Sequence, residues 1–177
     1  MKPTGINELY QAAFTELPIA HHKRHFVMAV LDCFSRYLLV LRVSPTASIP
    51  DLIKGLNQAL EEARLVSDLP TDRAITLVTD TGPRLNAQVF SDYVAGSPFR
   101  LGPGEPRTFR SLGSIRRLLW TQKDEETGVN LYRNPDEAQR SLELFRRTYN
   151  FERPHQALAY KVPGDFFCKR RVGGPAL

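Results

Sequence analysis

The sequence predicts an α/β domain in which a mixed five-stranded sheet is flanked by helices. Three dense strand patterns follow one another near the N-terminus with short connections, which indicates an antiparallel meander. Strand and helix patterns then alternate, and a strand reached through a helix can lie parallel in the same sheet. The 177 residues, of which 42% are hydrophobic and 24% charged, suffice for one such domain with its own core.

The first half of the chain supplies the meander and one helix. Strands are expected at residues 7–18, 25–34 and 37–43. Pro18 ends the first of them because it offers no backbone N–H to a sheet. Ser48, which can cap a helix, and Pro50 in the first turn predict a helix over residues 50–65. Apolar residues recur there three and four positions apart, so one side of this helix is expected to be buried.

The second half is expected to complete the sheet. A fourth strand is predicted at residues 74–79, a helix around Phe90, and a short strand at residues 99–101 within a Gly- and Pro-rich loop. Further helices are predicted over residues 108–123 and from Asn134 onward. The last stretch, residues 150–177, is expected to be irregular. This element order is a ribonuclease-H-like pattern, with the first and fourth strands adjacent at the sheet centre.

The fourth strand ends in a carboxylate. Asp80 follows the strand directly, and Thr81-Gly82-Pro83 then breaks the backbone. A carboxylate at this point faces the crevice in which open α/β sheets bind their ligands. The alternative is that Asp80 caps a turn or the next helix, as Asp commonly does.

Three motifs in order resemble the integrase catalytic core shared by retroviral integrases and bacterial insertion-sequence transposases. They read V-T-D-T-G-P-R at residues 78–84, M-A-V-L-D-C-F-S-R-Y at 28–37, and Y-N-F-E-R-P-H-Q-A-L at 149–158. The resemblance covers residues 9–167, which implies a core-like domain between short tails at 1–8 and 168–177. It also implies a ribonuclease-H-like fold and a role in DNA integration or transposition. The DNA-binding helical domain that usually precedes such a core is missing from this sequence, so a remnant or a repurposed module is expected.

The resemblance implies a site of three carboxylates that hold two divalent metals for phosphoryl transfer. It places Ala13 at the first acid, Asp80 at the second, and Arg116 at the third, with 35 residues between the last two. A guanidinium beside a divalent ion is repelled by several kcal/mol even at an effective dielectric of about 20. We therefore expect no bound metal and a core that is catalytically inactive, retained for DNA binding or assembly.

Two other interpretations remain open at this stage. An active strand-transfer enzyme would need displaced carboxylates such as Glu16 or Asp32, together with Mg²⁺ or Mn²⁺. A decayed transposase fragment would fold without a role. The four histidines lack ligand spacing and are expected to be solvated or packed; they are His21, His22, His25 and His155.

The basic residues point to DNA as the partner. Residues 100–123 contain six Lys or Arg side chains and the single acid Glu105. The net charge of this segment therefore equals the +5 of the whole chain. Phosphate contacts are predicted for Arg107, Arg110, Arg117 and Lys123. The alternative is a solvated helix face. Trp120 in this helix is expected to lie in the core or an interface rather than to stack on a base. A homodimer, or assembly with an active transposase, is a further expectation.

The cysteines and the hydropathy indicate the compartment. Cys33 and Cys168 form neither a metal spacing nor a disulfide framework, which favours a reducing environment. No stretch approaches the roughly 20 apolar residues that cross a bilayer. The sequence therefore predicts a cytoplasmic protein without a membrane partner.

Overall fold

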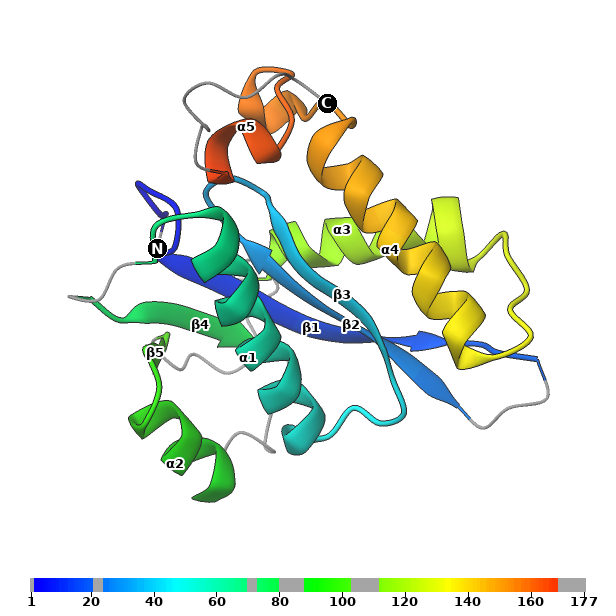
Figure 1. The fold of residues 1–177 in the computed structure, drawn as a ribbon, viewed down its shortest axis with the longest axis horizontal. Helices are drawn as coiled ribbons and strands as arrows, with labels where there is room; N and C mark the ends of the chain where they lie inside the picture. Colours follow the sequence, from blue (N-terminus) through cyan, green and yellow to red (C-terminus); the bar gives the residue numbers. More distant parts are fainter. Residues whose placement is uncertain (1, 21–23, 70–72, 80–87, 103–111, 169–177) are drawn as a thin grey trace.

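The five strands form one mixed sheet in the order β3-β2-β1-β4-β5 (Figure 1). The computed structural model describes residues 2–20, 24–69, 73–79, 88–102 and 112–168. The strands are β1 (Leu9–Leu17), β2 (His25–Asp32), β3 (Leu38–Ser44), β4 (Ile75–Thr79) and β5 (Phe99–Leu101). β1, β2 and β3 form the antiparallel meander, whereas β4 runs parallel to β1 and β5 parallel to β4. The predicted ribonuclease-H-like sheet, with the first and fourth strands adjacent, is confirmed.

The helices fill the predicted places, with differences at their ends. They are α1 (Ile49–Val66), α2 (Gln88–Ala95), α3 (Gly113–Gln122), α4 (Pro135–Phe151) and α5 (Gly164–Phe167). A π-helical turn (Lys123–Thr127) follows α3, and a 3-10 turn (Gln156–Leu158) precedes α5. Ser48 and Asn134 cap α1 and α4 as predicted, by accepting backbone N–H groups from Asp51 and Glu137. Among the described residues, no helix is both long and apolar enough to cross a membrane.

The structure corrects two predictions of secondary structure, one for the stretch from residue 150 and one for the start of the first strand. The stretch from residue 150 is not irregular throughout, because α4 continues to Phe151 and two short helices follow. Phe167 of α5 is buried and its ring stacks on Tyr37 at 4.5 Å between centroids, a tertiary contact that local sequence does not reveal. The first strand begins at Leu9 rather than Asn7, because Asn7 has a positive φ of 60° that no strand contains.

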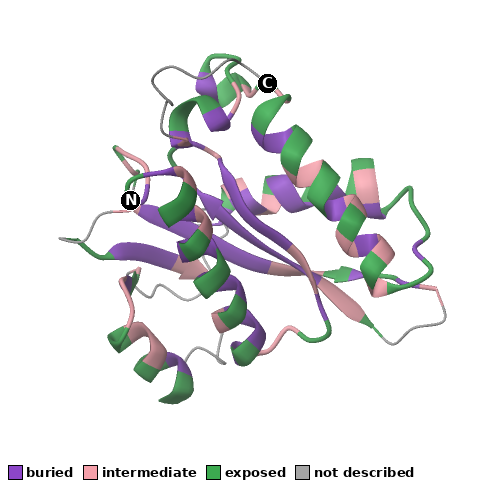
Figure 2. Ribbon diagram, in the orientation of Figure 1, coloured by how far each residue is buried: buried purple, intermediate pink, exposed green. Residues whose placement is uncertain are grey.

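The sheet is covered on both faces, and its strands alternate between two cores. Met28 and Val30 of β2 face the core under α1, while Val27 and Ala29 face the core under α3 and α4. Figure 2 shows the buried strands between helices whose exposed sides point outward. α1 lies so close to β2 that a Cβ at Gly55 would come within 2.2 Å of the Met28 sulfur. Any larger residue at Gly55 would therefore require the Met28 side chain to move.

One edge of the sheet is closed by side chains of α4. Asn150 accepts the backbone N–H of Leu38 at 2.8 Å and donates its amide to the Leu38 carbonyl at 3.0 Å. Gln139 accepts the N–H of Val43 at 2.7 Å, near the far end of β3. Between them, Arg146 donates to the carbonyl of Leu39 at 3.2 Å. These side chains bond to edge groups of β3 that another strand would otherwise pair with.

Candidate functional site

The centre of the candidate site is the pairing of β1 with β4. Ala12 of β1 pairs with Thr79, the last residue of β4, and Ala13 is the next residue of β1. Asp80, which follows Thr79 in the sequence, lies outside the described residues. The predicted neighbourhood of the two strands is confirmed, while the closeness of Ala13 to Asp80 stays a prediction. Ala13 itself is 1% exposed and belongs to the apolar cluster under α3 and α4.

Gln11 attaches the start of α3 to this strand. The side chain of Gln11 is buried, and its Oε1 accepts the backbone N–H of Ile115 at 2.9 Å. The first N–H groups of a helix lack intrahelical partners, and Leu112, which precedes α3, provides no side-chain cap. Arg36 adds a second contact by donating to the Ser114 hydroxyl. α3 therefore begins at a fixed place beside Ala13, because Ile115 and Ala13 share one buried cluster.

Arg116 follows this anchor directly. It is half-buried at the margin of α3, whose inner face consists of Leu112, Ile115, Leu118 and Leu119, the four residues predicted for it. The resemblance also predicts that the Arg116 guanidinium contacts the Asp80 carboxylate, since 35 residues separate the two positions. Because Asp80 lies outside the described residues, this contact stays a prediction. What the structure gives is that Arg116 directly follows Ile115, whose backbone N–H is bound by Gln11 of β1.

The described residues at this place do not fit a divalent metal. Neither Ala13 nor Arg116 offers an oxygen ligand, and Mg²⁺ requires such ligands in near-octahedral geometry. In the part of the chain that the structure describes, no cluster of three or more His, Cys, Asp or Glu side chains could hold an ion. A metal site of the kind implied by the resemblance would need carboxylates that these two positions lack.

The carboxylates considered as substitutes are engaged elsewhere. Asp32 is fully buried, where one oxygen accepts the N–H of Asn7 and the other accepts the N–H and hydroxyl of Ser35. Burial raises the pKa of Asp32, against the lowering effect of these hydrogen bonds. Glu16 forms an exposed ion pair with Arg24 at 3.0 Å. Asp32 therefore fixes the turn after β2.

Of the four histidines, two lie among the described residues. His155 packs edge-on against Tyr149 with ring centroids 4.7 Å apart, which confirms the packed interpretation for this residue. Burial lowers the pKa of His155, although a hydrogen bond that the imidazole donates to the Tyr149 backbone opposes the shift. His25 begins β2, and His21 and His22 lie outside the described residues.

Two of the four residues that are predicted to contact DNA lie among the described residues. Arg117 and Lys123 are exposed on α3 and at the start of the π-helical turn, while Arg107 and Arg110 lie outside the described residues. Their contacts with DNA stay a prediction. Trp120 is 74% exposed on the same helix, so it does not lie in the core of this chain, and its expected place in an interface stays a prediction.

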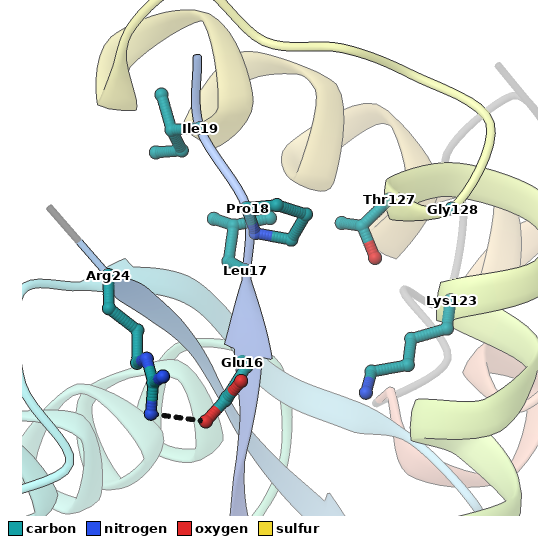
Figure 3. A pocket seen from close by; sticks show the side chains of 8 residues that line it. All are labelled: Glu16, Leu17, Pro18, Ile19, Arg24, Lys123, Thr127 and Gly128. Carbon is teal, nitrogen blue, oxygen red and sulfur yellow. Dashed lines mark hydrogen bonds and ion pairs between the residues drawn. The ribbon is translucent and has the colours of Figure 1, made fainter. Parts of the chain in front are cut away.

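A pocket of about 560 Å³ lies beside Lys123 (Figure 3). Its walls come from the end of β1 and from the π-helical turn; they are Glu16, Leu17, Pro18, Ile19, Arg24, Lys123, Thr127 and Gly128. Figure 3 shows the Lys123 ammonium projecting along one wall and the Glu16–Arg24 ion pair on the other side. The pocket lining combines the apolar Leu17, Pro18 and Ile19 with three charged side chains.

Sequence reasoning missed Gln11. Its signal was a single amide side chain inside the apolar strand L-Y-Q-A-A-F, where an unpaired polar group would be costly to bury. Such a residue in a central strand needs a partner from another element, and here the partner is the backbone of α3.

The sheet order and the helix placement define an α/β protein of the ribonuclease-H-like class. A family model described as the integrase core domain matches residues 99–163. No curated protein matches the sequence. The chain is thus similar to integrase cores in sequence over somewhat more than a third of its length.

Solved structures extend the similarity to the whole fold. A chain of the simian T-cell lymphotropic virus intasome, solved in complex with PP2A regulatory subunit B56 gamma, aligns with a TM-score of 0.69 at 16% identity. That alignment covers 100% of this chain and 60% of the viral chain. The HTLV-2 integrase catalytic core domain in complex with magnesium aligns at 0.61 and 17% identity, covering 93% of this chain and 97% of that one.

The BIV integrase catalytic core domain aligns with a TM-score of 0.62 at 14% identity, over 91% of this chain and 93% of that chain. At such identities the structural matches establish the fold. Together with the family model over residues 99–163, they show that this chain has the fold of an integrase core.

Proposed function

We propose that this chain is an integrase-like core that has lost two-metal catalysis and is retained to bind DNA and assemble with other subunits. The observation that carries the proposal is the anchored start of α3. In support of the proposal, Gln11 anchors the start of α3 to β1, the strand that carries Ala13. By the resemblance, Ala13 and Arg116 stand at two of the three acid positions, and neither is an acid. Restoring the acids at these two positions is therefore a direct test.

Metal binding is measured first. Calorimetric titration of the unmodified protein with Mg²⁺ or Mn²⁺ is expected to show no binding, because a guanidinium repels a divalent cation and an alanine offers it no ligand. The double variant A13D/R116E replaces both residues by carboxylates, and it is expected to bind Mn²⁺. Metal-dependent cleavage of a labelled duplex by the unmodified protein would reject the proposal and favour an active enzyme with displaced carboxylates.

DNA binding rests on the exposed cations of α3. Each Lys or Arg that neutralises a phosphate contributes about −0.9 to the slope of log K against log salt. Arg117→Ala and Lys123→Ala are therefore each expected to weaken duplex binding and to reduce that slope by about 0.9. Fluorescence anisotropy of a labelled duplex over a salt series measures both quantities.

Arg64→Ala is the matched control for these variants. Arg64 is an exposed cation in the last turn of α1, and α1 covers the opposite face of the sheet from α3. This variant is expected to leave the salt slope unchanged. Binding that does not depend on salt, or that falls equally in all three variants, would contradict the proposed DNA role and leave a folded fragment without that activity.

Assembly is proposed by analogy with the related structures. The HTLV-2 catalytic core is described in a dimeric form, and the simian viral chain comes from an intasome. We infer that this chain also associates, as a homodimer or with an active transposase. Sedimentation velocity over a concentration series tests the homodimer, and a single monomeric species at the highest concentration would reject it.

A further inference from the structure

The pocket beside Lys123 has two walls that backbone hydrogen bonds hold in place. The carbonyl of Lys123 accepts the N–H of Gly128 at 2.7 Å and closes the π-helical turn. A Cβ at Gly128 would come within 2.5 Å of that carbonyl oxygen, so any larger residue would force the backbone of the turn to shift. The N–H of Ala20 donates to the carbonyl of Tyr132 at 3.0 Å, which ties the segment after β1 to the segment after the turn. Walls that are fixed relative to each other lower the entropy cost of binding a ligand between them.

The lining of the pocket carries one cation that is not neutralised by a neighbour. Arg24 and Glu16 form an ion pair at 3.0 Å, so their charges cancel. Lys123 is exposed and forms no ion pair with another residue that the structure describes. Figure 3 shows its ammonium directed into the space between the π-helical turn and the end of β1. The pocket therefore presents a single positive charge to a ligand.

The wall formed by the end of β1 supplies apolar surface. Leu17 and Ile19 belong to the buried cluster under α3 and α4, and both also line the pocket. Pro18 lies between them and is exposed. Because proline has no backbone N–H, this residue offers a ligand apolar contact without a competing donor. A ligand that fits both walls has an apolar body and one negative charge.

We propose that this pocket binds a small organic carboxylate, with the carboxylate on the Lys123 ammonium and the apolar body of the ligand against Leu17, Pro18 and Ile19. The volume of about 560 Å³ lies within the range of pockets that hold a compact organic molecule. The inference goes beyond the proposed function and does not rest on it, because the ligand needs neither DNA nor the positions of the lost acids.

The position of the pocket favours a carboxylate over a phosphate. Proteins commonly bind phosphates with several cations or with the free N–H groups at the N-terminus of a helix. This pocket offers one unpaired ammonium and lies at the C-terminal end of α3, where the helix dipole is negative. Thr127 adds a hydroxyl on the same wall as Lys123 (Figure 3), and a hydroxyl can donate to a carboxylate oxygen.

A series of four probes tests the inference on the unmodified full chain without DNA. The probe 1-naphthoate has both features, acetate keeps only the charge, 1-naphthalenemethanol keeps only the rings, and 1-naphthyl phosphate carries more negative charge. Titrations followed in ¹H–¹⁵N NMR spectra report the affinity and the place of binding. The naphthoate is expected to bind roughly tenfold more tightly than acetate and roughly fivefold more tightly than the alcohol. The phosphate is expected to bind no more tightly than the naphthoate, and the largest shifts are expected at the amides of Thr127 and Gly128.

Two variants separate the Lys123 contact from general attraction to a basic protein. Lys123→Met keeps the apolar stem and removes the charge, so it is expected to bind naphthoate roughly fivefold more weakly and to bind the alcohol with unchanged affinity. Arg133→Met is the matched control, because Arg133 is an exposed cation in the segment before α4 and does not line the pocket. This control is expected to bind naphthoate as the unmodified protein does.

Several results would overturn the inference. Equal affinities for the naphthoate and the alcohol, an unchanged affinity in Lys123→Met, or shifts confined to residues away from the pocket would each reject it. A tripeptide that ends in leucine presents the same carboxylate and apolar body at the end of a peptide chain. If this peptide binds more tightly than the naphthoate, the pocket recognises a peptide C-terminus and the small-molecule proposal is wrong. Loss of DNA binding in the salt series would leave these results unaffected.

Discussion

The two edges of the sheet are held in different ways. At the β3 edge, α4 supplies Gln139, Arg146 and Asn150, and each bonds to backbone groups of the strand. At the β5 edge, the strand has only three residues, and Arg100 reaches back to the Thr76 hydroxyl at 3.1 Å. Helix α4 covers the edge of β3, whereas the edge strand β5 is very short. Both features protect a sheet edge from pairing with another chain. The difference indicates that stability is concentrated on the β3 side, away from the β1–β4 end where the candidate site lies.

The largest effect is expected from Asn150→Ala. Asn150 is fully buried, and its amide satisfies both the N–H and the carbonyl of Leu38. Leaving two buried backbone groups unpaired is expected to lower the free energy of unfolding by about 2–4 kcal/mol. Urea denaturation measures the change. Asn130→Ala is the control, because Asn130 is exposed and its amide bonds to Glu126 rather than to a buried strand. Equal losses in the two variants would show that the β3 edge is not specially stabilised by Asn150.

A smaller effect is expected from Arg146→Met. The guanidinium bonds to Glu62 of α1 at 3.1 Å and to the carbonyl of Leu39, and its side chain is only 19% exposed. Met keeps the apolar stem but leaves Glu62 without its cation, so a loss of about 1–2 kcal/mol is expected in the same urea experiment. Arg147→Met changes the exposed neighbour and should cost less than about 0.5 kcal/mol. A loss at Arg146 as small as at Arg147 would weaken the contrast between the edges.

A third expectation concerns pH at the end of α4. Burial lowers the pKa of His155, so the folded protein binds this proton less readily than the unfolded chain. Stability associated with neutral His155 is therefore present above the ordinary histidine pKa of about 6.5 and is lost as the pH falls through the lowered value. His155→Gln should flatten the decline of Tm between pH 7 and pH 5, while Arg147→Met should leave its shape unchanged. An identical decline in His155→Gln would show that other groups cause the loss.

The smallest effect is expected at the β5 edge. Arg100→Ala removes an exposed side chain and its bond to Thr76, and should cost about 0.5 kcal/mol or less. Urea denaturation of this variant beside Asn150→Ala gives the comparison of the two edges directly. A loss at Arg100 that approaches the loss at Asn150 would mean that β5 is held as firmly as β3.

Much of the fold could be predicted because local sequence patterns determine where its strands and helices begin and end. The alternation of apolar residues in β1–β3, the caps at Ser48 and Asn134, and the helical spacing in α1 each agree with the tertiary structure. The prediction failed where tertiary contacts decide. α5 contains only four residues, and it packs through the stack of Phe167 on Tyr37, which is distant in sequence.

The candidate site could be predicted less completely. The family resemblance placed Ala13 and Arg116 by motif, and the structure brings β1 and α3 together. The role of Gln11 was not predicted, because a single polar residue in a strand does not identify its partner. The exposure of Trp120 was not predicted either. Helical spacing places Trp120 at the margin of the apolar face, and only the packing of α3 decides which side of that margin is covered.

The hydrogen bond from Ile115 to Gln11 joins positions 104 residues apart, which has a consequence for the order of folding. The β1–β2 and β2–β3 pairings close over short connections, so they carry a smaller loop-closure entropy and are expected to form early. The junction of α3 with β1 requires most of the chain and is expected to form late. A nascent chain that has emerged only through α1 can therefore build the meander, while the place where Ala13 meets α3 does not yet exist.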